Sequence, residues 1–306
     1  MTNSTFPGVD AYLDSEGAPV ERALERAVVT LEQCEAPLEP EVLGAIRHGV
    51  MGGGKRLRPI LFASAYEACG REAKEASYDL AASLEMIHAY SLMHDDLPCM
   101  DDAALRRGRA TTHRVHGEEV TIRAGAALIP AAALQALDAS GRLGCERARC
   151  LILVRTLMVA AGAGGMVGGQ WMDLLGEGLA LGTEDLDALH RMKTGALLTA
   201  SLEMGALAAD ADKDTRDALR MYGQATGLAF QIADDVLDAT ASPETLGKNP
   251  SDADLDKSTY VALYGLEEAR RRARDQVDIA ISALNAVEID SSALLALGRY
   301  VVERRK

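Results

Sequence analysis

Helical periodicity runs through almost the whole chain and limits the folds that are open to it. Leu80, Leu84 and Ile87 recur at spacings of four and three, which places them on one stripe of a helix. The same pattern predicts helices over 18–33, 39–49, 119–138, 143–162, 184–209, 214–237 and 265–286. Short turn signals separate these segments, and no convincing strand pair or tandem repeat interrupts them. The sequence therefore predicts one all-α domain over residues 1–306, with a short flexible N-terminus at about 1–17.

Composition excludes several classes of partner. The chain has 306 residues, of which 48% are hydrophobic and 25% charged, so it can bury a sizeable core. Its 46 acidic and 32 basic residues give a net charge of −14. Binding to nucleic acid or to an anionic membrane surface needs a basic face, so neither is expected. An anionic ligand must instead be held by locally clustered Lys and Arg or through metal ions.

The N-terminus and the cysteines indicate a cytoplasmic protein. The first residues, MTNSTFP, have neither the basic start nor the apolar stretch of a signal peptide. No uninterrupted apolar run is expected to span a membrane, since Pro130 and Lys193 interrupt the longest candidates. The five cysteines are an odd number without CxxC spacing, so reduced thiols are expected.

One acidic cluster lies on the helix predicted over 214–237. At 100° per residue, its polar side chains fall within about 100° of one another on one face. They are Gln231, Asp234, Asp235 and Asp238. Like charges on one face repel each other, most strongly when apolar neighbours desolvate them, so the cluster needs a cation. Carboxylate oxygens without Cys or clustered His favour a hard ion, which predicts Mg2+ with Mn2+ as the alternative.

A second acidic cluster, HDDLPCMDD, occupies residues 94–102. Pro98 is expected to end the helix, so Asp101 need not follow helical geometry. The bend can bring Asp95 and Asp101 to one metal ion. His88 lies seven residues before Asp95, on the same helical face. Either cluster alone would suit an exposed acidic helix, but two that continue apolar helices predict a metal-dependent site.

Basic residues occur close to these acids in the sequence. Three cations follow a flexible turn in GGGKRLRP at 52–59, and the RRG of 106–108 follows the acidic cluster at 94–102. Lys193-Thr194-Gly195 breaks a helical stretch, and Lys248 and Lys257 follow the other acidic cluster. Arg suits bidentate phosphate recognition and Lys supplies a point charge. Cations beside metal-binding carboxylates predict a site for a polyanion such as diphosphate.

Two further motifs have simpler explanations. The glycine-rich GAGGMVGG at 162–169 follows no predicted strand and lacks phosphate-loop spacing, so a close approach of two helices is expected. The basic run at 270–274 lies beside Glu267 and Glu268, which predicts a solvated helix face.

Together, these motifs resemble the trans-isoprenyl diphosphate synthases, or polyprenyl synthetases, of the bacterial farnesyl and geranylgeranyl diphosphate synthase type. The resemblance extends from about residue 20 to the C-terminus, and it rests on the order of the motifs. They are GGKRLRP at 53–59, EMIHAYSLMHDDLPCMDD at 85–102, LRRG at 105–108, GGMVGGQWMDL at 164–174, MKTGALL at 192–198, QIADDVLD at 231–238 and LGKNPSDADLDKSTYV at 246–261. The family implies antiparallel helices around a deep central cavity, usually in a homodimer. It also implies Mg2+-assisted condensation of isopentenyl diphosphate with dimethylallyl or geranyl diphosphate, and with farnesyl diphosphate as a further acceptor.

The resemblance also implies roles for individual residues. The implied metal ligands are carboxylates, namely Asp95, Asp96, Asp101, Asp234, Asp235 and Asp238. Asp96 and Asp235 can also be structural rather than direct ligands. The implied catalytic contacts to the allylic diphosphate are Arg106, Lys193, Thr194 and Gln231, joined by Lys248. The implied isopentenyl diphosphate site consists of Lys55, Arg58, His88 and Arg107, and Lys257 completes the substrate-binding set.

Simpler roles stay open for some of these residues. His88 can be a satisfied core histidine, and Thr194 can cap a helix end. Arg56 and Lys257 can be surface charges. The chain also departs from the family at Ala103 and Ala104, which stand where related enzymes continue the acidic run.

A second departure lies at Ala126, where the family pattern LAGDAL has an acid, and Arg123 adds a charge nearby. We expect this exchange to alter a polar network beneath the acidic cluster at 94–102. It motivates an alternative function, a weakly active or non-catalytic partner subunit. A terpene cyclase of similar architecture is a third hypothesis, but it would have little reason to keep Lys55, Arg58 and His88 for a second diphosphate.

Product length is expected to depend on cavity depth. Tyr90 lies five positions before Asp95, about 7.5 Å along a helix axis, which is the scale of one or two isoprene units. A large aromatic side chain there can form a floor, and Ser91 is too small to add to it. The sequence therefore favours the fifteen-carbon farnesyl diphosphate as product. The twenty-carbon geranylgeranyl diphosphate is the alternative, since facing helices also set the depth.

Overall fold

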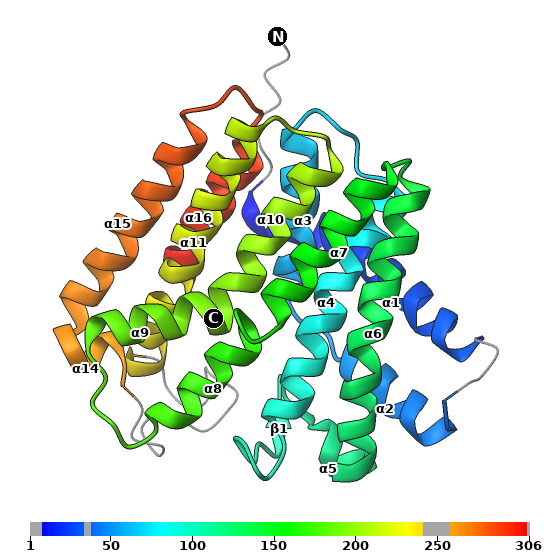
Figure 1. Ribbon diagram of the computed structural model, residues 1–306. Helices are drawn as coiled ribbons and strands as arrows, with labels where there is room; N and C mark the ends of the chain where they lie inside the picture. Colours follow the sequence, from blue (N-terminus) through cyan, green and yellow to red (C-terminus); the bar gives the residue numbers. More distant parts are fainter. Residues whose placement is uncertain (1–7, 34–37, 241–257, 305–306) are drawn as a thin grey trace. The chain divides into compact units, whose positions relative to one another are not determined.

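Helices make up nearly all the regular structure in residues 8–33, 38–240 and 258–304, which the computed structural model describes (Figure 1). The predicted all-α class is confirmed. The chain divides into two compact units that alternate along the sequence. Unit 1 comprises Met1–Tyr12, Leu61–Glu72 and Arg155–Lys306, and unit 2 comprises Leu13–Ile60 and Ala73–Val154. Each unit is all-α, and the single domain stays a prediction.

Unit 2 is built around α4 (Glu75–Asp95), which packs along α6 (Glu118–Arg142) and α2 (Pro40–Val50) (Figure 1). The predicted stripe is confirmed, since Leu80, Leu84 and Ile87 are all fully buried. Nearly every side chain of α4 from Ser77 to Met93 is buried, as expected for a helix surrounded by others. The short α5 (Thr112–His116) and most of α1 (Val9–Glu32) complete the unit.

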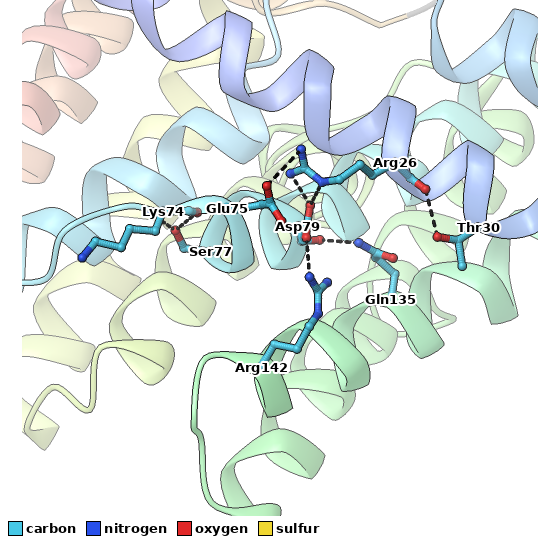
Figure 2. A network of polar contacts seen from close by, with 8 residues as sticks. All are labelled: Arg26, Thr30, Lys74, Glu75, Ser77, Asp79, Gln135 and Arg142. Atoms are coloured by element: carbon cyan, nitrogen blue, oxygen red, sulfur yellow. Dashed lines mark hydrogen bonds and ion pairs between the residues drawn. The ribbon is translucent and has the colours of Figure 1, made fainter.

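A buried carboxylate joins three helices of unit 2 (Figure 2). Asp79 of α4 accepts hydrogen bonds from Arg26 of α1 at 2.5 and 3.0 Å and from Arg142 of α6 at 2.8 Å. Gln135 of α6 donates to the Asp79 backbone carbonyl at 3.0 Å. A buried carboxylate is tolerated only when it is paired and hydrogen-bonded, so this network fixes α1 and α6 against α4.

Unit 1 is built around the long α11 (Lys213–Thr240), which packs against α10 (Ala196–Ala208) and α15 (Leu266–Leu284) (Figure 1). Its other elements are α8 (Met166–Gly176), α9 (Thr183–His190), the π-helix η1 (Arg191–Gly195), α14 (Tyr260–Tyr264) and α16 (Ser292–Glu303). Leu186, Leu228, Ile232 and Tyr260 form one buried cluster of this unit. Helices α3 (Leu57–Ala68) and α7 (Arg147–Ala161) contribute residues to both units.

The structure corrects two expectations about local structure. Helix α1 begins at Val9, so the predicted flexible N-terminus is wrong for 9–17; Gly17 and Pro19, which usually disfavour helix, lie inside it. A strand pair is also present, although none was expected. It joins β1 (Leu105–Arg106) to β2 (Arg109–Ala110) in antiparallel register, and it was missed because each strand has only two residues.

Two apolar helical segments correct a third expectation. By length and composition alone, α6 and the stretch Arg147–Gly176 are long and apolar enough to cross a membrane. This is weak evidence, because core helices of globular proteins pass the same test, and α6 buries Leu128 and Ala132. Pro130 lies inside α6 without ending it.

Two other expectations are confirmed. The four described cysteines, Cys69, Cys99, Cys145 and Cys150, are thiols rather than disulfides, and Cys34 lies outside the described residues. The basic run on α15 is a solvated face, since Arg270 pairs with Glu267 at 2.8 Å and Arg271 with Glu268 at 2.6 Å.

Candidate active site

The turn after α4 brings the backbones of two acidic residues of unit 2 together. Helix α4 ends at Asp95, and the chain turns through Pro98 as predicted. The backbone N–H of Asp101 donates to the Asp95 carbonyl at 2.9 Å, which closes a loop over residues 95–101. Asp102 adopts a left-handed φ of 44°, and its carboxylate pairs with Arg114 at 3.0 Å. The bend therefore places the Asp95 and Asp101 backbones side by side, and directs Asp102 to a different partner.

Asp96 has a different environment from its neighbours. It is buried, and Arg106 donates to both of its carboxylate oxygens, through Nε at 2.8 and 3.0 Å. The Nη2 atom of Arg106 lies 2.7 Å from the same carboxylate. Burial opposes the charge of Arg106, but the hydrogen bonds and charge of Asp96 outweigh it and raise the Arg106 pKa. The pair supports a structural role for Asp96, as one of the two alternatives allowed.

A tight hairpin carries Arg106 and Arg107. Arg107 and Gly108 connect β1 to β2 with φ values of 54° and 74°. Two successive positive φ values define a type I′ turn, which matches the twist of a short hairpin. The positive φ of Arg107 is uncommon for a residue other than glycine. The guanidinium of Arg107 donates a hydrogen bond to the backbone carbonyl of Gly53.

Arginines of unit 2 converge around His88 of α4. Arg58 and Arg107 act most strongly on its imidazole, followed by Arg106 and Arg56. Burial and these four positive charges hold the His88 pKa well below its ordinary value, so the ring is neutral at pH 7. Its Nδ1 atom is buried and has no hydrogen-bond partner among the described residues. A satisfied core histidine is therefore excluded.

Arg58 presents a second unsatisfied donor in the same cluster. Its Nε is buried, again with no hydrogen-bond partner in the described part of the chain. Burial, with a contribution from Arg107, lowers the Arg58 pKa to about 10, although Glu85 opposes the shift. The guanidinium still carries its charge at pH 7. Buried donors without partners are rare and costly, so they mark a place where an anion can bind.

Arg56 lies in the interior next to the arginine cluster around His88. It is buried, and it pairs with Glu85 at 2.9 Å and Glu21 at 2.7 Å, while donating to the Val50 carbonyl. The surface-charge alternative for Arg56 is therefore wrong. Lys55, next to it in sequence, is exposed.

Tyr90 and Ser91 lie one turn before Asp95 on α4. Tyr90 is buried, and its ring meets the His94 ring edge-on at 5.7 Å. Burial and the nearby Asp95 raise the Tyr90 pKa to about 12, so the phenol stays neutral. Ser91 donates to the His88 carbonyl at 3.0 Å. Their influence on product length stays a prediction.

The second acidic cluster lies on the uninterrupted helix α11 of unit 1. Asp235 is buried and accepts a hydrogen bond from the Tyr260 backbone N–H at 2.7 Å. Asp234 pairs with Arg304 at 2.6 Å. Because successive helical residues are about 100° apart, these two carboxylates take partners from two different elements, α14 and the C-terminal end of α16. Asp238, one turn further on, is half-buried.

A small hollow of about 90 Å³ gathers Lys193, Gln231 and Asp235 within unit 1. Lys193 lies on the π-helix η1, where the helical ladder changes between α9 and α10. The predicted break in the helix is thus confirmed, and π-bulges are frequent at functional sites. Lys193 donates to Asp173 of α8 at 2.6 Å. Thr194 lies inside η1 rather than at a helix end, so its capping alternative is wrong.

Glycines of α8 make this position of Lys193 possible. A Cβ at Gly169 would collide with the backbone of Met192 and Lys193, and one at Gly168 would meet the Met192 side chain. The close helix approach predicted for 162–169 is therefore confirmed. Its consequence is that η1 lies directly against α8, which supplies the carboxylate of Asp173.

Three polar residues of unit 1 were missed as candidates from the sequence. Asp173 and His190 line the same hollow as Lys193, and His190 Nδ1 lies 3.5 Å from the Gln231 amide. Gln170 of α8 has both amide atoms buried without a described partner. Gln170 and Asp173 lie in the quoted motif GGMVGGQWMDL, so the polar residues of that motif were the available signal.

The departure at Ala126 has a simpler outcome than expected. Ala126 is exposed on α6, and Arg123 pairs at the surface with Glu119 at 2.7 Å and Glu39 at 3.6 Å. An acid at this position would not be part of a buried network, so the expected disturbance beneath the first cluster is wrong. Ala103 accepts a hydrogen bond from Thr111 through its backbone carbonyl, which any residue there supplies.

The roles of the predicted site residues stay predictions. Among the described residues, no three His, Cys, Asp or Glu side chains are gathered closely enough to hold a metal on their own. Lys248 and Lys257 lie outside the described residues.

Comparison with known proteins shows the family to which the chain belongs. The family model for polyprenyl synthetase matches residues 39–294. Farnesyl diphosphate synthase of Escherichia coli is 41% identical over 295 residues, covering 94% of this chain and 98% of that protein. The large subunit 1 of heterodimeric geranylgeranyl pyrophosphate synthase from Arabidopsis thaliana is 39% identical over 300 residues. The alignment covers 96% of this chain and 79% of that protein.

Solved structures extend the likeness to three dimensions. A geranyltransferase from Legionella pneumophila aligns with a TM-score of 0.84 at 30% identity, covering 97% of each chain. An FPP/GFPP synthase from Zymomonas mobilis aligns with a TM-score of 0.80 at 34% identity, covering 96% of this chain and 98% of that one. The chain therefore belongs to the polyprenyl synthetase family of trans-isoprenyl diphosphate synthases.

Proposed function

We propose that the protein is a short-chain trans-prenyltransferase that joins isopentenyl diphosphate to allylic diphosphates and releases farnesyl diphosphate. The observation that carries this proposal is a pair of buried nitrogen atoms without a described partner, Arg58 Nε and His88 Nδ1, surrounded by further arginines. In a chain of net charge −14, such a concentration of positive charge needs an anionic ligand. A terpene cyclase needs one diphosphate site, whereas a prenyltransferase needs two.

The residues divide into two diphosphate sites. In unit 2, Lys55, Arg58, His88 and Arg107 are proposed to hold isopentenyl diphosphate. Neutral His88 offers one N–H, and the arginines supply bidentate contacts. In unit 1, Lys193, Thr194 and Gln231 are proposed to hold the allylic diphosphate, with Arg106, Lys248 and Lys257 as the remaining members of the set.

The carboxylates fit Mg2+. Both clusters offer oxygen ligands without sulfur, and a backbone hydrogen bond joins Asp101 to Asp95. Mg2+ is usually bound by one or two carboxylates together with substrate phosphates, so groups of fewer than three protein ligands suit it, with Mn2+ as the alternative. We assign direct contacts to Asp95, Asp101, Asp234 and Asp238, and supporting roles to Asp96 and Asp235. When bound, the metal neutralises diphosphate charge and promotes its departure.

The chain's own groups serve the reaction in distinct ways. The allylic carbon–oxygen bond breaks, the double bond of isopentenyl diphosphate attacks the resulting cation, and a proton leaves to the released diphosphate. Lys193 and Arg106 stabilise the departing negative charge. The irregular backbone of η1 and the Gln231 amide carbonyl are proposed to stabilise the carbocation. Burial of the apolar tail protects that cation from water.

Tyr90 is proposed to limit the product to fifteen carbons. It is a buried aromatic one turn before Asp95, and its ring is held against His94. Removing the ring deepens the space beside α4. The variant Tyr90→Ala is expected to yield twenty-carbon or longer products, while Ser91→Ala is expected to leave the product at fifteen carbons.

We further propose a cytoplasmic homodimer. Helix α6 exposes Leu134 and Leu137, and α7 exposes Leu151 and Ile152. Exposed large apolar side chains on neighbouring turns are typical of protein interfaces, and burial by a second copy would explain the apolar character of both helices without a membrane. Light scattering of the purified protein is expected to give twice the mass of 32.5 kDa.

The product assay tests the proposed activity. Purified protein, Mg2+ and isopentenyl diphosphate are incubated with the five-, ten- or fifteen-carbon allylic diphosphate, and the dephosphorylated products are separated by chain length. Farnesol as the endpoint from the two shorter primers supports the proposal. A twenty-carbon endpoint keeps the enzyme class but removes the role of Tyr90. A folded protein that elongates no primer points to a partner subunit.

A further inference from the structure

The largest hollow beside η1 does not include any predicted site residue. Its volume is about 400 Å³, against about 90 Å³ for the hollow around Lys193. The end of α7, η1, α10 and α11 form its walls, all within unit 1. A volume of this size is enough for a small organic molecule.

Positive charge dominates this hollow. Arg155 of α7, Arg191 of η1 and Arg220 of α11 reach it from three different elements, and Glu203 of α10 supplies the lining's carboxylate. Glu203 is already engaged by Arg220 at 2.7 Å, and Asp217 contacts the other terminal nitrogen of Arg220 at 2.8 Å. Arg220 is therefore held in place, and Asp187 lies 4.0 Å from Arg191 outside the lining. Among the lining residues themselves, three arginines stand against one carboxylate. This excess is unusual in a strongly acidic chain.

The remaining walls provide both hydrogen-bonding and apolar groups. Thr199 and Gln224 add uncharged polar groups, and Val159 and Ala196 add apolar surface. Arginines from three elements favour an anionic occupant such as a phosphomonoester, which carries a charge of about −1.5 to −2 at pH 7. Arg155 and Arg191 are exposed, and each guanidinium can contribute a pair of hydrogen bonds to a phosphate group.

We propose that this hollow is a second anion site, which binds a small phosphorylated organic molecule. The site goes beyond the prenyltransferase activity, and its occupancy can be measured without substrate. It has one structural link to that activity, because Arg191 and Gly195 of the hollow belong to the same five-residue η1 that carries Lys193 and Thr194. An occupant that contacts Arg191 therefore touches the element that positions Lys193.

Calorimetric titration with glycerol 3-phosphate tests the site, with glycerol as the uncharged control. The full-length wild type is expected to bind glycerol 3-phosphate saturably and glycerol not at all. The double variant Arg155→Gln/Arg191→Gln removes two charge-assisted contacts and is expected to weaken binding at least about tenfold. Arg147→Gln, an exposed change two turns earlier on α7, is expected to bind like the wild type.

The variant Arg58→Gln separates this site from the proposed isopentenyl diphosphate site, and it is expected to keep the binding. Circular dichroism checks folding, and the single variant Arg155→Gln, at an exposed position, replaces the double variant if the latter is unfolded. The proposal is overturned if the wild type shows no saturable binding. It is equally overturned if the arginine variants bind as tightly as the wild type, or if Arg58→Gln abolishes the binding.

Discussion

The two acidic clusters have similar sequences but depend on different backbone structures. In unit 2, the chain leaves α4 at Asp95 and turns through Pro98, and one backbone hydrogen bond joins Asp101 to Asp95. In unit 1, Asp234, Asp235 and Asp238 lie on one uninterrupted helix. The first cluster therefore depends on a loop, whereas the second depends on the helical period and on the packing of α11.

The partners of the two clusters differ as well. Asp96 is buried, and Arg106 of the following hairpin satisfies it. Asp234 is 39% exposed, and its partner Arg304 is the more buried member, lying over the Phe230 ring at 3.7 Å. A DDxxxxD or DDxxD sequence therefore does not fix which carboxylate has a structural role and which is available to a metal ion. Burial and the partner that satisfies the carboxylate decide it, which is Arg106 for Asp96 and the Tyr260 backbone N–H for Asp235.

The largest expected effect tests the loop of the first cluster. Asp101→Asn removes the charge of a proposed metal ligand in the loop 95–101. The value of kcat is expected to fall at least about 100-fold. Asp102→Asn is the matched control, because Asp102 is exposed and pairs with Arg114 instead. It is expected to change kcat less than about threefold. Equal losses in the two variants, measured by release of diphosphate, would contradict the assignment.

The second effect compares the stability of the two ion pairs. Arg106→Gln leaves Asp96 buried without its partner, and the free energy of unfolding is expected to fall by about 3 kcal/mol. Arg304→Gln leaves Asp234 in contact with water, so a loss of about 1 kcal/mol is expected. Urea unfolding measures both values. A larger loss for Arg304→Gln would reverse the comparison.

The third effect concerns the close approach that positions Lys193. Gly169→Ala forces α8 away from η1, and overpacking of this kind is expected to cost about 2 kcal/mol and to raise KM for the allylic diphosphate. Gly164→Ala meets nothing within 4 Å and serves as the control. Thermal unfolding and initial rates measure the two consequences. An unchanged KM in a destabilised Gly169→Ala variant would separate packing from substrate binding.

The smallest effect is the pH dependence contributed by His88. Its folded-state pKa is lowered by burial and by the arginines around it, so the unfolded state binds its proton more readily. Stability from this group is therefore present above the unfolded pKa, near 6.5, and is lost as the pH falls below it. Between pH 7.5 and 5.5, the wild type is expected to lose about 1 kcal/mol more than His88→Gln. Parallel losses in urea unfolding would exclude this contribution.

The sequence predicted the elements with strong periodicity better than the rest. The buried stripe of α4, the bend at Pro98 and the break at Lys193 follow from local rules, and all three are confirmed. The start of α1 was placed too late because Gly17 and Pro19 disfavour helix locally, while tertiary packing overrides them. Local rules describe preferences of a short segment, so they fail where distant contacts decide.

Partner choice in the site was the least predictable part. Arg56 was open to interpretation as a surface charge, but Glu21 and Glu85 hold it in the interior. Gln170 and Asp173 were not predicted as site residues. They follow a glycine-rich segment whose spacing predicts backbone packing and carries no information about the partners of polar side chains. These pairings join residues far apart in sequence, and spacing within one segment carries no information about them.

The most direct measurement is the transfer of label from isopentenyl diphosphate into allylic product by the wild type, with Mg2+ and with the metal removed by a chelator. We expect label to be incorporated rapidly onto geranyl diphosphate with Mg2+. After chelation we expect no incorporation, and we expect it to recover when Mg2+ is restored. We also expect that Arg58→Gln raises KM for isopentenyl diphosphate more than for geranyl diphosphate. A folded protein that consumes geranyl diphosphate without incorporating isopentenyl diphosphate would contradict the two-diphosphate site.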